Sequence, residues 1–177
     1  TNDARISGTL ASLCGLEKAI SAKDEKHIAT AIQKILLVQA SSIFLGGIPM
    51  LFYGDEAAYT NDYSYLEDEG KSYDNRWMHR PLIDWKKNER TGIKGTEEHA
   101  VFSATQKMLG LRKKFHVFSD EKNIKWFWPL NIHVAGYVRE LEGNKFYCLF
   151  NYSNKEAFLT WFGFREFNGS IKYLTDH

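Results

Sequence analysis

Three stretches of the sequence carry side chains of types that could do chemistry. The first is Gly54-Asp55-Glu56, which directly follows a short apolar run. Paired carboxylates are components of acid/base and glycosyl-transfer sites, and loops after the carboxyl ends of barrel strands build such sites. The residues alone favour a plainer structural role, in which Glu56 orients neighbouring groups through hydrogen bonds and Asp55 turns the chain.

The second stretch runs from Asp74 to Pro81 and contains two arginines, a histidine and a tryptophan. Arginine forks suit planar carboxylates and can also donate to sugar hydroxyls. The same loop could equally bind phosphate or fix the chain through salt bridges, and the residue types leave these alternatives open. The third stretch is Asp3 to Thr9, whose small residues leave room for a ligand to approach Arg5; in isolation it has little specificity.

Composition narrows the class of partner. The chain has 177 residues, of which 44% are hydrophobic, enough for one sizeable core or two small ones. A net charge of +1 with interspersed acids and bases argues against a nucleic acid or an anionic membrane as partner. A neutral ligand is therefore expected. Aromatic residues make up 15%, and aromatic faces commonly hold sugars, although most of these rings are expected in the core.

Cysteine usage and the chain start add little about chemistry. Cys14 and Cys148 lie far apart and read as small buried hydrophobes, and there is no CxxC or His/Cys spacing typical of a metal site. No targeting or membrane-spanning segment is visible in the sequence. Because the chain begins with Thr1 rather than Met, we expect a shortened chain whose parent's signal cannot be judged, with a cytoplasmic location favoured.

Hydrophobic spacing predicts the elements that position these stretches. Residues 25–45 form the surest helix, with Asp24 as its cap and Gly46-Gly47 at its end. The apolar run from Met50 to Tyr53 is typical of a buried parallel strand, so helix, turn and strand together predict an α/β unit. A long polar loop follows over residues 54–95, and a second helix is predicted over 97–114 after a Thr96 cap.

Beyond Phe118 the pattern changes from helix to strand. Short alternating runs separated by turn signals predict antiparallel strands, and hence a separate C-terminal domain from about residue 120. The predicted strands are residues 124–127, 132–139, 145–151, 157–161 and 171–174.

The order of these motifs resembles the C-terminal portion of the amylosucrase-like enzymes of the α-amylase superfamily, glycoside hydrolase family 13. The matching pieces are D-x-R-[VI]-S-G-T, a long helix, G-x-P-x-x-x-x-G-D-E, an acidic loop with D-x-R-W-x-H-R-P, and a helix with L-R-K. The resemblance extends from Thr1 through Phe115 and more loosely to the end. Asp3 to Thr9 and Asn75 to Pro81 are its more specific parts.

The resemblance implies a fold for each half of the chain. Residues 1–118 would be the last part of a (β/α)8 barrel, including the end of the insertion after its seventh strand. Residues 119–177 would be an antiparallel β-sandwich-like domain. In such enzymes the nucleophilic Asp, the acid/base Glu and the transition-state-stabilising Asp all lie upstream of this portion, so no catalytic residue is expected in this chain.

The resemblance also implies roles for individual residues. Arg76 matches an arginine at the floor of the donor-glucose pocket, and Arg5 matches one lining the acceptor or fructosyl side. Glu56 matches a supporting position, and Asp55 and His79 are placed with it as supporting residues. No metal and no organic cofactor are expected.

The implied activity is that of a sucrose-acting retaining transglucosidase that makes α-1,4-glucan. Its partners would be sucrose, α-glucan and the missing N-terminal part of the same enzyme, without nucleic acid or membrane. Sucrose hydrolysis, sucrose phosphorolysis and α-glucosidase action are alternatives within the superfamily. A different alternative is a carbohydrate-binding or structural module, with the aromatic residues of 124–164 forming a platform for sugars.

Overall fold

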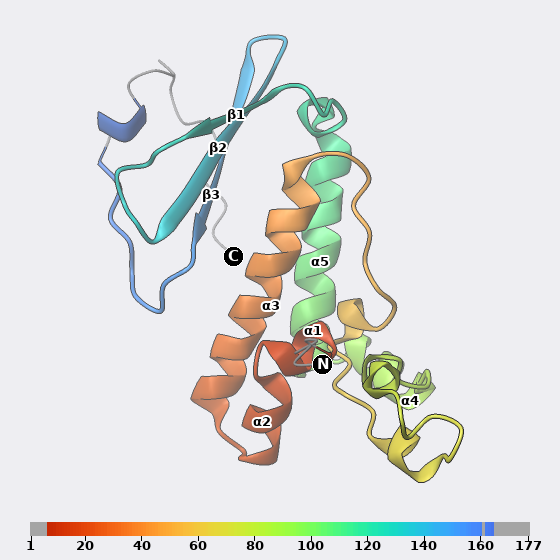
Figure 1. Cartoon of the computed structure of the whole chain (residues 1–177). Coiled ribbons are helices and arrows are strands. Elements are labelled where there is room, and N and C mark those ends of the chain that lie inside the picture. Colours follow the sequence, from red (N-terminus) through yellow and green to blue (C-terminus); the bar gives the residue numbers. More distant parts are fainter. Residues whose placement is uncertain (1–6, 161, 165–177) are drawn as a thin grey trace. The chain divides into compact units, whose positions relative to one another are not determined.

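The computed structural model of the chain describes residues 7–160 and 162–164 (Figure 1). These residues form five α-helices, several short 3-10 turns and a three-stranded antiparallel sheet. The chain divides into two compact units. The first unit comprises Thr1–Gln39 and Leu51–Lys107, and the second comprises Ala40–Met50 and Met108–His177. Both long helices contribute to each unit, and the predicted domain boundary at residues 118 and 119 stays a prediction.

Both long helices begin where their caps predict. Helix α3, Glu25–Leu45, follows Asp24, whose carboxylate accepts the His27 backbone N–H at 3.0 Å. Helix α5, Glu97–Lys114, follows Thr96, whose hydroxyl accepts the His99 backbone N–H at 3.1 Å. Each cap satisfies a donor that the first turn of a helix leaves free. The two helices predicted from spacing are therefore confirmed.

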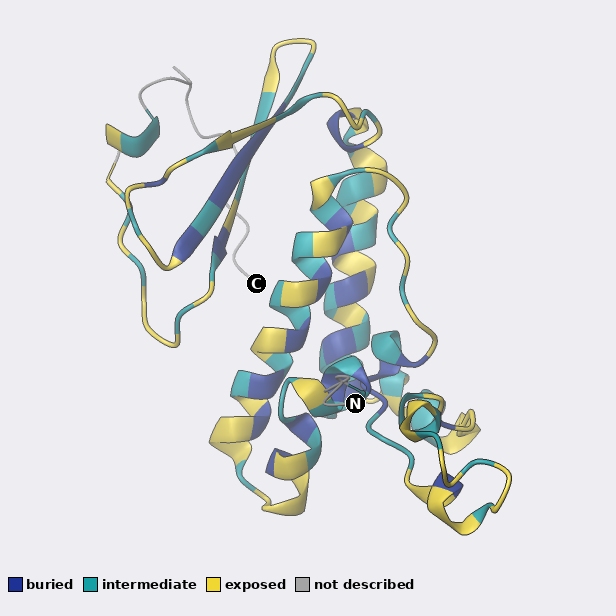
Figure 2. Ribbon diagram, viewed as in Figure 1, coloured by how far each residue is buried: buried dark blue, intermediate teal, exposed yellow. Residues whose placement is uncertain are grey.

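The core of the first unit lies where two short helices meet α3. These are α1, Leu10–Leu13, and α2, Leu16–Ser21. Small and branched apolar side chains fill the core, and Figure 2 shows buried positions recurring along α3. The buried members are Ala11, Leu16, Ala19, Ile28, Ala31, Ile35, Ala58 and Val101.

A buried amide links the helices of the first unit to the polar loop. The Gln39 side chain is 2% exposed; its oxygen accepts the Thr105 hydroxyl at 2.6 Å, and its nitrogen donates to the Asp55 carbonyl at 3.2 Å. A buried polar group is costly unless paired, so these bonds fix the start of the loop. The loop then folds into short turns: η1 Asp55–Ala57, η2 Ser64–Glu67, η3 Asn75–His79, α4 Trp85–Glu89 and η4 Arg90–Gly92.

Helix α3 is long and apolar enough to cross a membrane when judged by length and composition alone. That test does not separate a spanning helix from the core helix of a globular domain. In this chain Ile28, Ala31 and Ile35 of the helix belong to the core of the first unit, and the buried Gln39 is paired on both sides. These residues pack part of the helix against the first unit, and 28% of its apolar window is buried.

The second unit contains the sheet β1-β2-β3, formed by Ile124–Phe127, Val134–Leu141 and Asn144–Asn151. All its pairs are antiparallel, so the strands predicted at 124–127, 132–139 and 145–151 are confirmed, with the second shifted by two residues. The predicted strand at 157–161 is wrong over 157–160. There the Phe158 carbonyl accepts a hydrogen bond from the Asn131 side-chain amide at 3.4 Å, and not from the backbone of a neighbouring strand. The strand predicted at 171–174 lies outside the described residues.

An aromatic and guanidinium core holds the second unit together. Rings of Phe44 and Phe146 pack on Phe118 with centroids 5.1 and 5.4 Å away. Phe118 belongs to the turn η5, His116–Phe118. Arg139 of β2 is 0% exposed and donates to backbone carbonyls at the end of α3 and around η5. Its acceptors are the carbonyls of Phe44 (3.0 Å), Leu45 (2.6 Å), Val117 (3.2 Å) and Asp120, and the Asn123 side-chain oxygen (2.6 Å).

The predicted buried strand from Met50 to Tyr53 is wrong in this structure. These residues form neither helix nor strand, and Met50 is 85% and Phe52 47% exposed. A buried parallel strand needs hydrogen-bonded neighbours on both sides. Among the described residues the sheet consists of β1, β2 and β3 only, and none of these pairs with this segment. The segment has the apolar pattern of a strand, but the partners that a strand requires are not among these residues.

We predict that Gly54→Ala destabilises the first unit. Gly54 has a φ of +87°, and an added Cβ would lie 2.8 Å from Cγ of Tyr59, closer than a carbon contact allows. The left-handed backbone alone costs about 1–2 kcal/mol for a residue with a Cβ. Urea unfolding should therefore show a loss of about 2 kcal/mol or more. Gly110→Ala, in open space within α5, is the control and should raise stability by about 0.5–1 kcal/mol. Equal changes in the free energy of unfolding for the two variants would contradict the close contact between Gly54 and Tyr59.

We predict that Arg139→Met unfolds or strongly destabilises the second unit. The change leaves helix-end carbonyls buried without donors, and hydrogen bonds from a charged group contribute about 1.5–3 kcal/mol each. The loss should therefore be at least about 3 kcal/mol. Lys125→Met removes the same charge from an exposed position of the same sheet and should change stability by less than about 0.5 kcal/mol. Thermal unfolding followed by circular dichroism measures both, and a shift in Tm no larger for Arg139→Met than for Lys125→Met would refute the role of Arg139.

Candidate functional site

The three stretches singled out from the sequence come together in the first unit. The Ser7 hydroxyl donates to the Asn75 side-chain oxygen at 3.1 Å, and the Thr9 backbone N–H donates to the Asn61 side-chain oxygen at 2.8 Å. Ser7 and Thr9 belong to the described end of the third stretch, Asp3 to Thr9. Arg5 lies outside the described residues, so its expected place on the acceptor or fructosyl side of the donor pocket stays a prediction.

Asn61 is the residue that joins these segments. Its side-chain oxygen accepts the Thr9 N–H, as described above. Its backbone N–H donates to the Ser12 hydroxyl at 2.9 Å, which ties the loop to helix α1. The next residue continues the join, because the Asp62 N–H donates to the Met78 carbonyl at 2.9 Å. One short segment therefore holds the start of the chain on one side and η3 on the other.

Two tyrosine hydroxyls fix the part of the loop that contains Pro81, Asp84 and Asn88. The Tyr59 hydroxyl accepts the Asp84 N–H at 2.8 Å, and its own proton is available to Asn88 Oδ1 at 2.9 Å or to the Asp84 carbonyl at 3.0 Å. Burial raises the pKa of Tyr59, so it stays a neutral donor. The Tyr53 hydroxyl donates to the Pro81 carbonyl at 3.1 Å. The segment after residue 52 is thus bound to the end of the second motif.

The adjacent acids Asp55 and Glu56 lie in η1, at the start of the loop. Burial raises the pKa of Asp55 and the neighbouring Glu56 carboxylate raises it further, while a hydrogen bond with the Leu10 backbone lowers it. That bond and the Gln39 amide on its carbonyl give Asp55 the partners of a residue that turns and fastens the chain. Retaining glycosyl transfer needs carboxylates about 5–5.5 Å apart across a bond, which adjacent positions on a tight turn do not offer.

Arg76 lies in η3 and forms an ion pair within its own turn. Its Nε lies 2.9 Å from both carboxylate oxygens of Asp74, and its Nη2 lies 2.7 Å from Oδ2. The guanidinium side chain is 56% exposed, whereas that of Asp74 is 19% exposed. Hydrogen bonds from Arg76 are the main cause that lowers the pKa of Asp74 to about 2. In this geometry Arg76 closes a turn and still presents its outer edge to solvent.

The other groups of the second motif also hold the loop. Two cations lie over the Trp77 ring, with Lys71 Nζ 5.4 Å and the Arg80 guanidinium carbon 5.2 Å from its centroid. His79 packs edge-on against Phe52 at 6.1 Å, and its buried Nδ1 has no hydrogen-bond partner among the described residues. Of the alternatives left open by the residue types, these contacts match the one in which the loop is fixed by its own charges.

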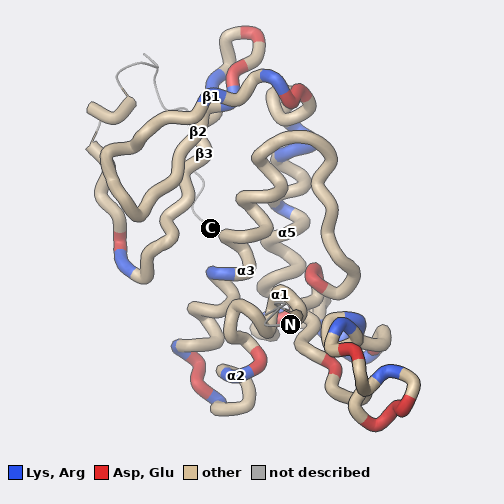
Figure 3. Tube along the Cα trace, viewed as in Figure 1, with Lys and Arg blue, Asp and Glu red and all other residues tan. Residues whose placement is uncertain are grey.

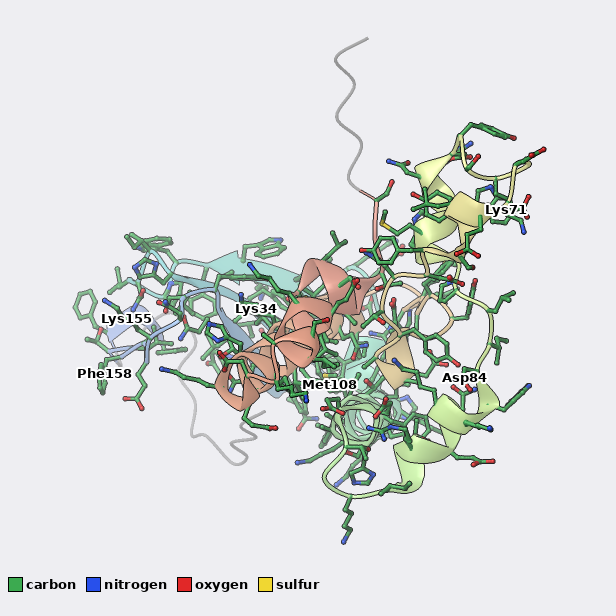
Figure 4. All side chains as sticks on the ribbon, turned by 90° about the horizontal axis from the view of Figure 1, so that it is seen from below. Lys34, Lys71, Asp84, Met108, Lys155 and Phe158 are labelled. Carbon is green, nitrogen blue, oxygen red and sulfur yellow. The ribbon has the colours of Figure 1, made fainter. Side chains whose placement is uncertain are left out.

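Charges of both signs are interspersed along this loop (Figure 3). Side chains crowd it from Lys71 at its outer end to Asp84 beside α4 (Figure 4). At its end the buried Glu98 carboxylate accepts Arg90 Nε at 3.0 Å and lies 3.9 Å from Lys87 Nζ. Within residues 7–160 and 162–164, no group of three or more His, Cys, Asp or Glu side chains could hold a metal ion.

Sequence reasoning missed Tyr59 and Asn61, whose side chains join the loop to Asn88 and to Thr9. Two signals for them are present in the sequence. One is Gly54, a position at which the nearby Tyr59 ring leaves no room for a Cβ, and the other is an Asn-Asp pair inside a polar loop of unusual length. A search against models of known protein families finds no match for this chain. The roles of Arg76, Glu56, Asp55 and His79 therefore rest on the sequence motifs and on the geometry above.

We predict that Asp74 titrates with a midpoint near pH 2 in the folded chain and that Arg76→Gln moves it back toward the ordinary 3.8. Because the folded-state pKa is lowered, the stabilisation by this pair is present above pH ~4 and is lost as the pH falls toward 2. Carboxyl NMR titration measures the midpoint. Arg80→Gln is the control: it removes a nearby charge that makes no hydrogen bond to Asp74, so the midpoint should hardly move. A midpoint near 3.8 in the unaltered chain would contradict the ion pair.

Proposed function

We propose that this chain is the C-terminal part of an amylosucrase-like enzyme, a sucrose-acting retaining transglucosidase that makes α-1,4-glucan. On this proposal residues 1–118 are the last part of a (β/α)8 barrel, and residues 119–177 form a β-sandwich-like domain. The order of the motifs supports it, and so does the order of elements: long helix, apolar segment, polar loop, second long helix and antiparallel sheet.

The observation that carries the proposal is the exposed apolar segment after α3. Met50 is 85%, Phe52 47% and Tyr53 43% exposed, in a run whose pattern predicts a fully buried strand. Large apolar side chains in such a run are rarely left in water without a partner. A barrel strand would show this exposure when both of its hydrogen-bonded neighbours belong to an upstream part of the same enzyme.

Each predicted site residue then has a supporting task. Arg76 helps to fix the donor-glucose pocket, and Arg5 orients the leaving fructose or the accepting sugar. Asp55, Glu56 and His79 support the wall that follows the apolar segment. The clustering of Ser7, Asn61 and Asn75 supports this assignment, since it holds the arginine-bearing motifs in one unit.

The reaction itself takes place on carboxylates upstream of this chain. A nucleophilic Asp attacks the anomeric carbon of the glucosyl unit of sucrose, and the acid/base Glu protonates the departing fructose. The 4-hydroxyl of a glucan end, deprotonated by the same Glu, then displaces the Asp. No metal or organic cofactor takes part, and this chain contributes the walls that orient the sugars.

The alternatives keep the glucosyl-enzyme and change what takes the glucose. Water gives a sucrose hydrolase, phosphate gives a sucrose phosphorylase, and a different donor gives an α-glucosidase. These depend on acceptor loops beyond this chain, so product analysis decides between them.

We predict that the 177-residue chain alone releases neither glucose nor fructose from sucrose, whereas the parent enzyme releases fructose and lengthens glycogen. The isolated chain lacks positioned carboxylates, and positioning and covalent catalysis together account for many powers of ten in rate. Sugar release is measured by chromatography, with and without glycogen. The Asp55→Asn, Glu56→Gln double variant is the matched control.

Two outcomes would overturn parts of this proposal. Turnover by the isolated chain that disappears in the double variant would make Asp55 and Glu56 a complete site. Release of equal glucose and fructose by the parent, unaffected by glycogen, would replace the transglucosidase with a hydrolase.

A further inference from the structure

The second unit contains an open concavity of about 320 Å³ at one end of its sheet. Its wall is formed by the end of β1, the connection to β2 and the residue after β3. Trp126, Trp128 and Tyr152 contribute large rings to it and are 65%, 57% and 58% exposed. Three large aromatic rings exposed around one hollow form a patch of the kind that marks a binding site.

The wall of this concavity is uncharged. No Asp, Glu, Lys or Arg occurs between Lys125 and Arg139, and this stretch is tan in Figure 3. The polar side chains among its lining residues are those of Trp126, Trp128, His133 and Tyr152, and indole, imidazole and phenol groups suit a ligand with hydroxyls around an apolar face. A charged ligand would lose its hydration there without gaining a counter-charge. The concavity therefore suits a neutral ligand.

Two of the three rings, those of Trp126 and Tyr152, are held in place before any ligand binds. Trp126 packs edge-on against Tyr137 with centroids 5.2 Å apart. The Tyr152 and Ser41 hydroxyls are hydrogen-bonded at 2.9 Å, and the Tyr152 N–H donates to the His133 carbonyl at 2.8 Å. Rings fixed in this way need little further ordering, which lowers the entropic cost of binding a ligand.

We propose that this concavity binds the sugar rings of a neutral α-glucan chain, with the indoles of Trp126 and Trp128 against the apolar faces of the rings. The choice of α-glucan among neutral sugars rests on the proposed function. The inference that the ligand is a sugar does not rest on the proposed function. It rests on the aromatic, uncharged and exposed wall, whatever enzyme the chain belongs to.

Maltoheptaose titrated into the 177-residue chain tests the proposal, with calorimetry for affinity and indole N–H NMR signals for location. We expect saturable binding that shifts the Trp126 and Trp128 signals. Trp128→Ala should weaken binding about tenfold or more, as for an aromatic contact at the centre of a site. Trp85→Ala is the matched control, because Trp85 is 73% exposed in the first unit and should not matter. Cellohexaose, a β-linked glucan, tests the linkage.

Every outcome bears on the proposal. Absence of saturable binding, or shifts confined to Trp85, would overturn it, and so would unchanged affinity in a Trp128→Ala chain with an unaltered circular dichroism spectrum. If that variant does not fold, the NMR shifts of the unaltered chain decide. Equal binding of cellohexaose would overturn the choice of α-glucan. Binding by this chain together with a parent inactive on sucrose would overturn the proposed function alone, and the reverse result would overturn this inference alone.

Discussion

The second unit depends on one buried guanidinium. Arg139 lies on β2 with no exposed surface, and it donates to carbonyls at the end of α3 and on both sides of η5. The last carbonyls of a helix have no partner within the helix, and a buried cation has no water, so each satisfies a need of the other. Burial is the main cause that lowers the pKa of Arg139. Helix end, turn and sheet are therefore fixed by one side chain.

That interaction explains why α3 ends where it does. A Cβ at Gly46 would lie 3.3 Å from Arg139 Nη1, and Gly46 and Gly47 both adopt positive φ, which glycine does at least cost. Arg112 of α5 adds donors to the Ile43 and Gly47 carbonyls. The glycine pair was sufficient to predict the helix end from the sequence. Its partner was not predictable, since Arg139 lies 95 residues after Phe44 and looks like an ordinary strand position.

Sequence prediction succeeded where the cause is local and failed where it depends on distant neighbours. Asp24 and Thr96 cap their own helices, and the turn at Glu142-Gly143 joins the two strands beside it, so these elements were predictable. Met50 to Tyr53 has the composition of a strand, but a strand exists only when another pairs with it. The site followed the same rule: the motifs were recognisable, whereas Asn61 and Tyr59 act through partners far along the chain.

The state of the charges in the first unit bears on how its loop could serve a sugar pocket. Arg76 is paired with Asp74 at the surface, where water screens an ion pair and competes for both partners, so such a pair is easily exchanged for another. The bonds of Tyr59 and Asn61 elsewhere in the loop are part-buried and neutral, and neither involves Arg76 or Asp74. The backbone of the loop can therefore stay fixed while Arg76 exchanges Asp74 for another acceptor. If Arg76 serves the proposed donor-glucose pocket, this combination of a fixed loop and an exchangeable ion pair lets it turn to a new acceptor without refolding the loop.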